Sequence, residues 1–437
     1  MRKIFVDELI NYSGKEVQFS GFVDTIRDKK WVMFVILKDH TGKVQMTLEK
    51  SDENNSKLLD IMNKVTKDSV IDIKCKVVVN EAVKLGGIEL IPSEIVVTSE
   101  ALELPFDYNN LDGVNLDTRL DYRWLDIRND KNTLLRLVES SLIQGMRDYL
   151  YKERFIEIHT PKLIGTASES GSSVFEVKYF DRLAYLAQSP QFYKQMALAS
   201  GLDRVFEIAP AFRAENSNTN RHATEFTSID LEFAYINSFE DVMDLEEDLI
   251  IAGLTKVKEE YGDKIKELFE KDVVIPKKPF PRMDLQDLYK ELNKEYGYNI
   301  PEHDVGDTNA ETEGLIYKYA MEKFNSEFMF VTGYAATKRP FYHMRKDGLL
   351  QGYDLIWRGT EITSGAQREH RFDELTKNVK EKGLGKDVEF YLQFFKYGCP
   401  PHGGFAIGLD RLVMLLLGTS TIKETQFLFR GPNRLNP

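Results

Sequence analysis

Hydrophobic and polar residues alternate over much of the first part of the chain, with the period of two that half-buried strands show. Alternating or continuously apolar runs, each the length of one strand, occupy residues 17–22, 31–37, 44–48, 70–79 and 88–97. Residues 57–65 have the spacing of a short helix. The pattern therefore predicts one domain of five strands and one helix over residues 1–101.

The order of these elements, with the helix between the third and fourth strands, matches the five-stranded oligonucleotide-binding (OB) barrel. Barrels of this kind present aromatic rings and hydrogen-bonding groups to unstacked bases. Phe34 and Gln45 are candidates for such a face. Phe34 fits a place in the barrel core equally well, whereas Gln45 lies on the polar phase of its strand.

The composition changes after this domain. Residues 102–130 are rich in Asp, Asn and Arg and have little periodicity, so we interpret them as a linker or hinge. Apolar residues at helical spacing then predict a helix over residues 131–153, and residues 155–161 predict a strand that Pro161 ends. A second domain is expected to run from residue 131 to residue 437.

Two short segments after this strand carry groups that suit an anionic ligand. Residues 168–173 are small and surround Glu169, which is typical of a loop that closes over a ligand and also of a plain surface loop. A helix that begins at Gln191 places Gln191 and Lys194 on one face. Because helix N-termini attract anions, Lys194 either adds to an anion site or is simply solvated.

The stretch from Phe212 to Phe233 concentrates charge between apolar positions. Turn-forming residues in its first half and alternation in its second half predict a strand, a polar loop and a strand. Polar side chains are expected to face a shared cleft, namely those of Arg213, Glu215, Arg221, His222, Glu225 and Asp230. Guanidinium groups fixed there suit a phosphate or carboxylate ligand, although composition alone supports a salt-bridged hairpin equally well.

Residues 237–301 are helical and highly charged, and we expect a peripheral helical insertion there. A second chemical cluster follows at residues 354–368. If residues 354–360 form one strand, Asp354 shares a face with Ile356, Arg358 and Thr360.

Asp354, Glu361 and Ser364 offer oxygen ligands to one hard cation. Mg²⁺ shared with a nucleotide phosphate fits such ligands, and a surface ladder of salt bridges is the alternative.

The third cluster, residues 400–418, combines glycines with a strongly apolar run. It predicts a strand that turns into a helix near Leu409, with Arg411 in the first turn pointing back toward the glycines. Small residues such as Gly408 let a flat ligand approach the backbone. The chain has neither a Gly-Lys-Ser phosphate loop nor a dinucleotide glycine fingerprint, so an arginine-lined antiparallel sheet must hold any nucleotide.

Composition limits the number of domains, the cellular compartment and the mode of nucleic-acid binding that we expect. The 437 residues predict two or three domains, and no apolar window is long enough for a membrane span. The two cysteines stand far apart and the first residues lack a signal-peptide core, which together predict a cytoplasmic protein. A net charge of −12 argues against broad nucleic-acid binding but allows a local basic patch.

The three clusters, taken in order, resemble the three signatures of class II aminoacyl-tRNA synthetases. Residues 155–161 resemble the first signature, residues 212–232 the second and residues 404–411 the third. The resemblance implies an α+β fold, in which an N-terminal five-stranded OB-fold β-barrel joins an antiparallel sheet flanked by helices. It also implies a homodimer built around the region of Pro161.

Within this class, residues 188–195 and 358–368 resemble aspartyl-tRNA synthetases of the archaeal and eukaryotic type. The resemblance implies that ATP, L-aspartate and tRNA are the ligands. It assigns Lys194 and Arg368 to the side-chain carboxylate of aspartate, and Asp230 to its α-amino group. The complete set of residues implied for aspartate is Glu169, Gln191, Lys194, Asp230, Ser364 and Arg368.

The same resemblance implies an ATP site in which Arg213 contacts the α-phosphate and Phe226 stacks on adenine. Both Arg213 and Arg411 are implied to act in catalysis. The full set implied for ATP is Arg213, Glu215, Arg221, His222, Phe226, Glu361, Gly408 and Arg411. Mg²⁺ is implied at Asp354, Glu361 and Ser364, and the anticodon at Phe34, Gln45 and Glu89.

The chain departs from the family pattern at three positions. Ala366 follows Gly365 where two glycines are usual, Gly431 lies where an aspartate is usual, and Asp24 replaces an aromatic residue or histidine in the barrel. Four alternatives remain: an asparaginyl enzyme, the charging of tRNA(Asn) as well as tRNA(Asp), a tRNA-binding protein without catalysis, and a tRNA-independent amide ligase, which would leave the barrel without a purpose. Lys194 argues against the asparaginyl enzyme, because an amide ligand leaves its charge unpaired.

Overall fold

The computed structural model describes residues 4–165, 174–217, 219–346 and 348–437. Its contacts divide the chain into two compact units, Met1–Gly113 and Val114–Pro437. In the described part of the chain, no helix combines the length and the apolar character that crossing a membrane requires.

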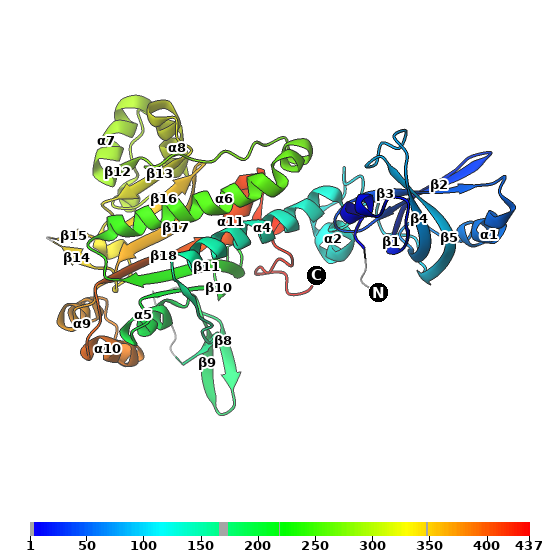
Figure 1. Cartoon of the computed structure of the whole chain (residues 1–437). Coiled ribbons are helices and arrows are strands. Elements are labelled where there is room, and N and C mark those ends of the chain that lie inside the picture. Colours follow the sequence, from blue (N-terminus) through cyan, green and yellow to red (C-terminus); the bar gives the residue numbers. More distant parts are fainter. Residues whose placement is uncertain (1–3, 166–173, 218, 347) are drawn as a thin grey trace. The chain divides into compact units, whose positions relative to one another are not determined.

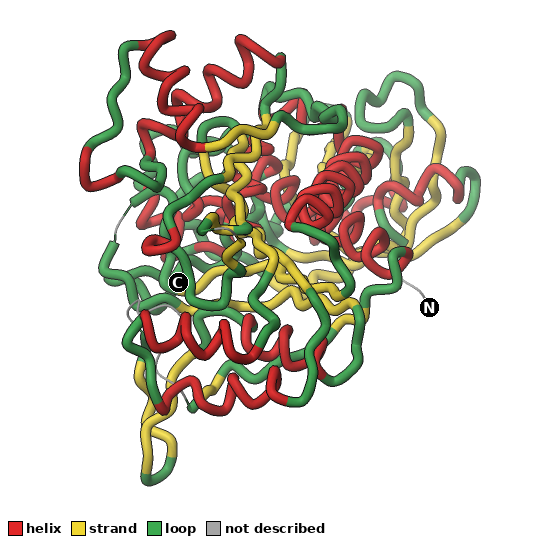
Figure 2. Tube along the Cα trace, turned by 90° about the vertical axis from the view of Figure 1, so that its left-hand side faces the viewer, coloured by secondary structure: helices red, strands yellow, loops and turns green. Residues whose placement is uncertain are grey.

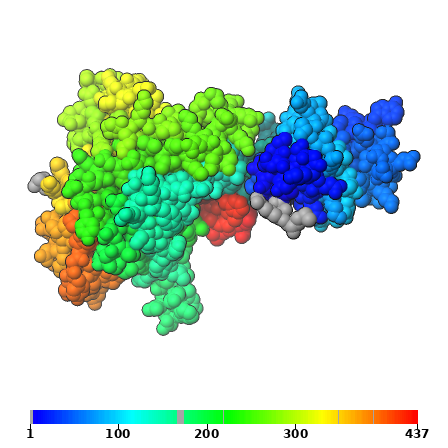
Figure 3. All heavy atoms as spheres, viewed as in Figure 1, coloured from blue at the N-terminus to red at the C-terminus, as the bar shows by residue number. Residues whose placement is uncertain are grey.

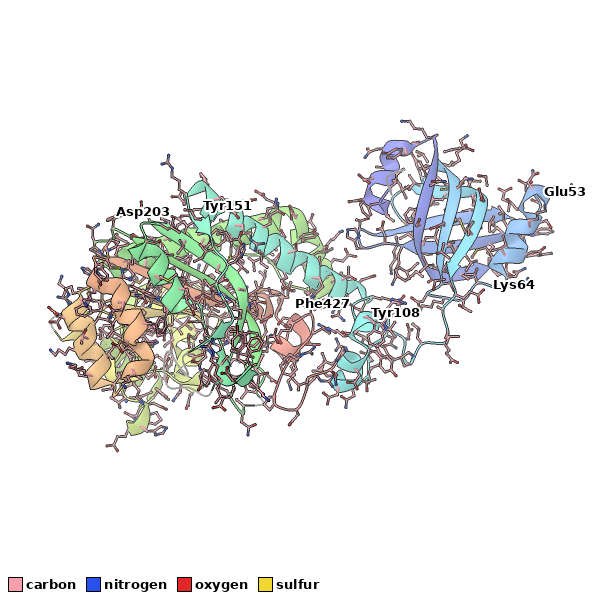
Figure 4. The ribbon with its side chains drawn as sticks, turned by 90° about the horizontal axis from the view of Figure 1, so that it is seen from below. Glu53, Lys64, Tyr108, Tyr151, Asp203 and Phe427 are labelled. Carbon is pink, nitrogen blue, oxygen red and sulfur yellow. The ribbon has the colours of Figure 1, made fainter. Side chains whose placement is uncertain are left out.

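The first unit is a closed barrel with the strand order β1-β2-β3-β5-β4 (Figure 1). Its elements are β1 (Glu16–Asp28), β2 (Val32–Lys38), β3 (Lys43–Glu49), α1 (Ser56–Met62), β4 (Val70–Val79) and β5 (Ile88–Ser99). Alternation drives the closure: in β4, Ile71, Ile73 and Cys75 point into the core while the residues between them are exposed. Figure 4 labels Glu53 and Lys64, which flank α1. The predicted five-stranded barrel, with one helix after its third strand, is confirmed.

Residues 102–113 belong to the first unit, where Tyr108 fixes them to the barrel. The Tyr108 hydroxyl accepts a hydrogen bond from Lys38 Nζ at 2.8 Å and donates one to Asp68 Oδ1 at 2.6 Å. The ring of Tyr108 is fully buried. The segment that the sequence assigned to a linker therefore starts as part of the barrel unit, and its remainder from Val114 belongs to the second unit.

The second unit is built on an eight-stranded sheet with the order β12-β13-β16-β17-β18-β11-β10-β6. The strands are β6 (Ile156–Glu157), β10 (Arg204–Phe212), β11 (Glu225–Ala234), β12 (Arg282–Asp284), β13 (Phe328–Thr332), β16 (Gly352–Trp357), β17 (Thr360–Gln367) and β18 (His402–Gly408). Neighbours pair antiparallel except at the two edges, where β6 pairs parallel with β10 and β12 with β13. Helices lie on both sides of this sheet (Figures 1 and 2), so the predicted α+β architecture is confirmed.

Three helices pack their apolar residues against one face of the sheet: α4 (Asp130–Lys152), α6 (Phe239–Phe269) and α11 (Leu409–Leu417). The start of α4 is capped by Asn129, whose side chain accepts a hydrogen bond from the Lys131 amide. A capping box between Ser238 and Asp241 starts α6.

The segment 237–301 differs from the peripheral insertion that its charge suggested. Val242, Leu249 and Val257 of α6 are fully buried in the main core, and β12 extends the sheet. The charged residues of α6 masked a buried stripe, because a long helix can be polar over most of its circumference and still be part of a core.

Residues 354–360 form a hairpin and not the single strand that was predicted. Trp357 pairs with Thr360, and the two residues between them, Arg358 and Gly359, both have positive φ, at 47° and 77°. Positive φ at both central residues is the condition for a tight type I′ turn. Asp354 consequently lies opposite Ser364 across two strands, and the predicted shared face with Arg358 is wrong.

The remaining elements surround this layer. They are α2 (Leu116–Asp121), α3 (Arg123–Asp126), β7 (Leu163–Ile164), β8 (Glu176–Tyr179), β9 (Arg182–Leu186), α5 (Gln191–Ala199), α7 (Leu285–Tyr296), α8 (Ala310–Phe324), β14 (Arg345–Lys346), β15 (Leu349–Leu350), α9 (Phe372–Glu381), α10 (Glu389–Lys396) and α12 (Ile422–Thr425). The hairpin of β8 and β9 stands out from the surface as a narrow lobe (Figure 3).

The two long helices α4 and α6 cross where each has a glycine. A methyl group added to Gly145 would lie 2.6 Å from Lys256 Cβ and 3.0 Å from the Ala252 carbonyl oxygen. One added to Gly253 would lie 2.9 Å from Leu142 Cδ1. The absence of side chains here lets the helices approach and bury Leu142 completely.

Replacing Gly145 with alanine is expected to destabilise the protein by about 1–3 kcal/mol, because the added methyl group over-packs the crossing. Equilibrium urea unfolding followed by circular dichroism measures the effect. Gly262→Ala is the matched control, since an added methyl group on this residue of α6 meets only Lys258 Cγ at 3.5 Å. The control should be neutral or stabilising by up to about 1 kcal/mol, as for alanine at an open helix position. Equal stability of the two variants would contradict the close crossing.

Candidate active site

The polar residues of β11 define a site on the face of the sheet opposite α4, α6 and α11. Ile229 and Leu231 point into the main core with those helices. Successive side chains of a strand point to opposite faces, so Ser228, Asp230 and Glu232 point to the other side. There they meet α5 and the end of β17.

Four buried charges form the centre of this site. Lys194 Nζ, from the first turns of α5, donates a hydrogen bond to Asp230 Oδ1 at 2.9 Å and lies 3.5 Å from Glu232 Oε2. Arg368 Nε donates to Glu232 Oε1 at 2.8 Å. All four side chains are almost completely buried. Burial acts to raise the pKa of Glu232, but Arg368 and Lys194 outweigh it and hold that pKa below its usual range.

Neutral side chains surround this cluster of buried charges. Gln191 Nε2 donates to Glu232 Oε2 at 3.3 Å and to Gln195 Oε1 at 3.1 Å. Gln195 also bonds His402 Nε2 at 2.8 Å. Since His402 Nδ1 lies 2.8 Å from the Pro400 carbonyl oxygen, Nδ1 donates and Nε2 accepts, and burial lowers the pKa of His402 to about 4. The pocket thus keeps a neutral imidazole behind its charged residues.

The loop between β10 and β11 borders the pocket. Arg213 follows β10, and its backbone N–H donates to the Thr224 carbonyl oxygen at 2.9 Å. The Arg213 guanidinium lies 5.3 Å from the centre of the Phe226 ring, close enough for a cation–π contact. The predicted strand, loop and strand are confirmed, and the two residues expected at the α-phosphate and at adenine are neighbours.

Two further arginines approach the same region. Arg411 lies in the first turn of α11, as predicted, and its Nη1 donates to the Glu361 carbonyl oxygen at 3.0 Å. A methyl group added to Gly408 would lie 4.0 Å from Arg411 Cγ, so this arginine does point back over the glycine. Arg221 Nη1 donates to Glu313 Oε2, from the first turn of α8, at 2.9 Å.

His222 lies among these cations. Burial first, and Arg411 second, lower the pKa of His222, while the charge of Glu215 acts in the opposite direction. The imidazole is therefore mainly neutral at pH 7, and it can donate one hydrogen bond and accept another.

The three residues expected to bind Mg²⁺ lie together at β16 and β17. Asp354 is opposite Ser364, but Arg339 already binds both of them. Its guanidinium donates to Asp354 Oδ1 at 2.9 Å, to Asp354 Oδ2 at 2.6 Å and to Ser364 Oγ at 3.1 Å. Burial and then the charge of Asp354 raise the pKa of Glu361 to about 7. A cluster of three or more His, Cys, Asp or Glu residues arranged to bind a metal is absent from the described residues.

The structure brings the expected residues into two adjoining groups, one around Lys194 and one around Arg411. Glu169 lies outside the described residues. Sequence reasoning missed Glu313, Arg339, Gln195 and His402. Asn309 caps α8 and acidic residues fill its first turn, which marks the helix, but nothing local marks the contact between Glu313 and Arg221.

In the barrel, the three residues expected at the anticodon share one outer face. Met33 and Val35 are buried, and Phe34 between them is only half-buried, so its side chain points outward. Gln45 pairs with Glu89 across β3 and β5. These two residues are linked through Thr47, whose hydroxyl donates to Glu89 Oε2 at 2.6 Å.

Asp24, where the family usually has an aromatic residue or histidine, is buried. Its Oδ1 lies 3.6 Å from Lys38 Nζ and 3.5 Å from Lys43 Nζ. Asp24 therefore belongs to a cluster of ion pairs within the barrel domain.

Comparison with known proteins agrees with this geometry. Residues 115–430 match the family described as tRNA synthetases class II (D, K and N), and residues 17–98 match the OB-fold nucleic acid binding domain. The chain is 41% identical over 430 residues to the aspartate–tRNA(Asp) ligase of Pyrococcus abyssi, covering 97% of each chain. It is 40% identical over 428 residues to the aspartate–tRNA(Asp/Asn) ligase of Methanopyrus kandleri, covering 97% of this chain and 96% of that one.

Among solved structures, the asparaginyl-tRNA synthetase of Pyrococcus horikoshii complexed with asparaginyl-adenylate is similar over the whole of both chains. The TM-score is 0.90 and the sequence identity is 31%.

The raised pKa of Glu361 predicts a pH-dependent effect of Glu361→Gln on the ligand-free protein. Between the ordinary value of 4.5 and about 7, the folded protein holds a proton that the unfolded chain has released, so this carboxyl lowers stability as pH rises. The variant, which imitates the protonated form, should have a higher Tm than the wild type at pH 8, and the difference should shrink toward pH 5. Scanning calorimetry across this range measures it.

Glu381→Gln is the control for this experiment, because Arg345 lowers the pKa of that exposed carboxyl by a hydrogen bond. The control should not raise Tm at pH 8. A Tm difference between Glu361→Gln and the wild type that does not change with pH would refute the raised pKa of Glu361.

Proposed function

Because the chain belongs to the class II tRNA synthetases of the D, K and N group, we propose that it joins L-aspartate to tRNA using ATP. The proposed intermediate is aspartyl-adenylate. The observation that carries this proposal is the pair of buried cations, Lys194 and Arg368, in the pocket beside β11. ATP–pyrophosphate exchange, run with aspartate and separately with asparagine, tests it. A preference for asparagine would overturn the proposal.

The contacts of Lys194 explain why aspartate suits this pocket. In the structure its Nζ pairs with Asp230 at 2.9 Å. We assign Asp230 to the α-amino group of the ligand, which then replaces Lys194 as its cationic partner. Lys194 in turn takes the side-chain carboxylate, together with Arg368. One ion pair is exchanged for two, and no buried charge is left alone.

Asparagine fits the same exchange badly. Its α-amino group would still take Asp230, but its side-chain amide gives Lys194 no negative charge. A buried ammonium left with only its 3.5 Å contact to Glu232 is costly, and this cost discriminates against the amide. We assign the remaining aspartate contacts to Glu169, Gln191 and Ser364.

For ATP, we assign Phe226 to the adenine ring, Glu215 and Gly408 to the nucleotide, and Arg213 to the α-phosphate. Arg221, His222 and Arg411 are assigned to the distal phosphates. Arginine suits this role because its planar fork can bond two phosphate oxygens at once. Glu313 orients Arg221 through the 2.9 Å hydrogen bond.

Mg²⁺ fits the carboxylates beside Arg411. Burial first, and then the negative charge of Asp354, raise the pKa of Glu361 despite the nearby Arg411, and a divalent cation would stabilise the ionised carboxylates. Because Arg339 occupies both oxygens of Asp354, we assign the ion mainly to Glu361 and Ser364, with Asp354 beside them. When bound, such an ion neutralises phosphate charge as pyrophosphate leaves.

The reaction then needs positioning and charge balance more than a protein nucleophile. The α-carboxylate of aspartate attacks the α-phosphorus, one O–P bond forms and the bond to pyrophosphate breaks. Arg213 balances the charge on the α-phosphate, and Arg221 and Arg411 hold the leaving group. A hydroxyl of the terminal tRNA ribose next attacks the activated carbonyl and releases AMP.

The proposal that the barrel binds the tRNA anticodon rests on the arrangement of three side chains. Phe34, Gln45 and Glu89 are assigned to anticodon bases because they share one outer face of the barrel.

A homodimer in the cytoplasm is also proposed. Large apolar side chains remain exposed at Tyr151 and Ile156, next to the segment that resembles the first class II signature.

The charging of tRNA(Asn) is the second candidate activity. The relative from Methanopyrus kandleri is named for both tRNA(Asp) and tRNA(Asn), whereas that from Pyrococcus abyssi is named for tRNA(Asp) alone. Aminoacylation of each purified tRNA with radiolabelled aspartate distinguishes the two cases. Asp24 is the position in the barrel to compare, because it departs from the usual aromatic residue or histidine.

Lys194→Met is expected to abolish activation of aspartate, because it removes the cation that the side-chain carboxylate needs. The loss should be at least about 100-fold in kcat/KM, since a charged hydrogen-bond partner is removed from a buried site. ATP–pyrophosphate exchange measures it. Lys290→Met, at an exposed position on α7, is the matched control and should be unchanged. Near-normal exchange in Lys194→Met would refute the pocket assignment.

Phe34→Ala is expected to weaken aminoacylation without affecting adenylate formation. Loss of one base-stacking contact, worth about 1–3 kcal/mol, should raise KM for tRNA by about tenfold or more. Parallel aminoacylation and pyrophosphate-exchange assays measure the two steps. Phe19→Leu, in the barrel core, shows the effect of simple destabilisation. If Phe34→Ala lowers Tm as Phe19→Leu does, Phe34 is a core residue.

A further inference from the structure

Residues 340–344 run beside the end of β17 and hold His343 opposite Arg368. The two residues form an isolated antiparallel bridge. The Met344 amide donates a hydrogen bond to the Gln367 carbonyl oxygen at 3.0 Å, which fixes the backbone next to this bridge. His343 belongs to none of the three class II signatures, and the proposed function gives it no role.

The His343 ring contacts the Arg368 guanidinium directly. His343 Nε2 lies 2.9 Å from Arg368 Nη1, and the two residues are 4% and 3% exposed. A guanidinium has only donors, so Nε2 is the acceptor and the ring is neutral with its proton on Nδ1. Burial, and then the charge of Arg368, lower the pKa of His343 well below its usual value, which agrees with this geometry.

The other contacts of Arg368 show what the imidazole adds. Nε donates to Glu232 Oε1 at 2.8 Å, and Nη2 donates to the Gly404 carbonyl oxygen at 2.9 Å. His343 holds the third nitrogen, Nη1, so acceptors on three sides fix the plane of the guanidinium. Glu232 already offers a full negative charge. A second carboxylate in place of His343 would cancel the charge that a ligand carboxylate needs, and a neutral acceptor does not.

The far side of the imidazole lies against a glycine. A methyl group added to Gly352 would lie 3.6 Å from His343 Nδ1 and 3.3 Å from the Ala366 methyl carbon. The imidazole and the Ala366 side chain therefore lie together in the space that Gly352 leaves open. Ala366 is one of the positions where the chain departs from the family pattern.

We propose that His343 is a positioning residue, which fixes the Arg368 guanidinium for the side-chain carboxylate of the amino-acid substrate without neutralising it. This inference rests on the proposed function of the pocket. It predicts that an acceptor at the Nε2 position is required for tight binding of the amino acid and is not required for binding of ATP.

Three variants test this proposal. Glutamine at 343 carries its amide oxygen about as far out as Nε2, asparagine carries it only as far as Nδ1, and leucine has no acceptor. In ATP–pyrophosphate exchange, His343→Leu and His343→Asn should raise KM for aspartate by about tenfold or more, which corresponds to about 1.4 kcal/mol. KM for ATP should stay within about twofold, and His343→Gln should stay within about threefold of wild type for aspartate.

Several outcomes would overturn the proposal. KM for aspartate close to wild type in the leucine and asparagine variants shows that the contact is dispensable. An equal rise in all three variants, or an equal rise in KM for ATP, shows a merely structural role. If leucine at this position unfolds the protein, as judged by Tm, the comparison between the asparagine and glutamine variants decides alone.

Failure of the proposed function is read separately from the wild type. If wild-type protein activates asparagine and not aspartate, the proposed substrate is wrong. The same three variants, assayed with asparagine, then show whether His343 positions Arg368 for that ligand.

Discussion

The structure of the site depends on one constraint, the mutual neutralisation of four charges in a dry pocket. Lys194, Asp230, Glu232 and Arg368 are each nearly inaccessible to solvent, and such charges are tolerated only when they are paired and hydrogen-bonded. The pairing requires that α5, β11 and the end of β17 meet within hydrogen-bond distance. Gly404 permits the approach, since a methyl group there would lie 2.4 Å from Glu232 Oε2. The buried charges therefore constrain the sequence of β18 as strongly as the hydrophobic core does.

The same balance explains why the pocket can select its ligand by charge. The two cations and two carboxylates sum to zero, and each of the four takes part in an ion pair. In the proposed pose, the α-amino group and the side-chain carboxylate of an acidic amino acid join these four charges and preserve their sum, while its α-carboxylate, the attacking group, lies with the nucleotide. An uncharged side chain breaks the pairing of Lys194. Neutral groups behind the charges, such as Gln195 and His402, fix geometry without changing the sum.

The sequence predicted the parts of the molecule in which local pattern and final environment coincide. The barrel strands, the β10–loop–β11 unit and the start of α11 near Leu409 follow from periodicity, which depends only on neighbouring residues. Alternation predicts a strand through the local turn at Arg358-Gly359, and the charges of α6 predict a peripheral helix because they outnumber its buried stripe. Contacts between distant segments set a further limit on what the sequence predicts. Glu313, Arg339 and His343 reach the site from segments far from β11, and no local pattern records that encounter.

The two parts of the site, around Lys194 and around Glu361, differ in how nearby cations balance the charge of their carboxylates. Around Lys194, that residue and Arg368 hold the pKa of Glu232 below its usual range, so the charges there balance one another within the protein. Around Glu361, burial and the neighbouring Asp354 hold the pKa at about 7, and the arginines there are bound to backbone oxygens and to Glu313. On the proposed assignment, triphosphate oxygens take over Arg221 and Arg411, and the Glu313 carboxylate and the negative charge around Glu361 then need a cation. On the proposed assignment, nucleotide and a divalent ion at Glu361 therefore strengthen each other's binding, whereas the site around Lys194 exchanges one ion-pair partner for another.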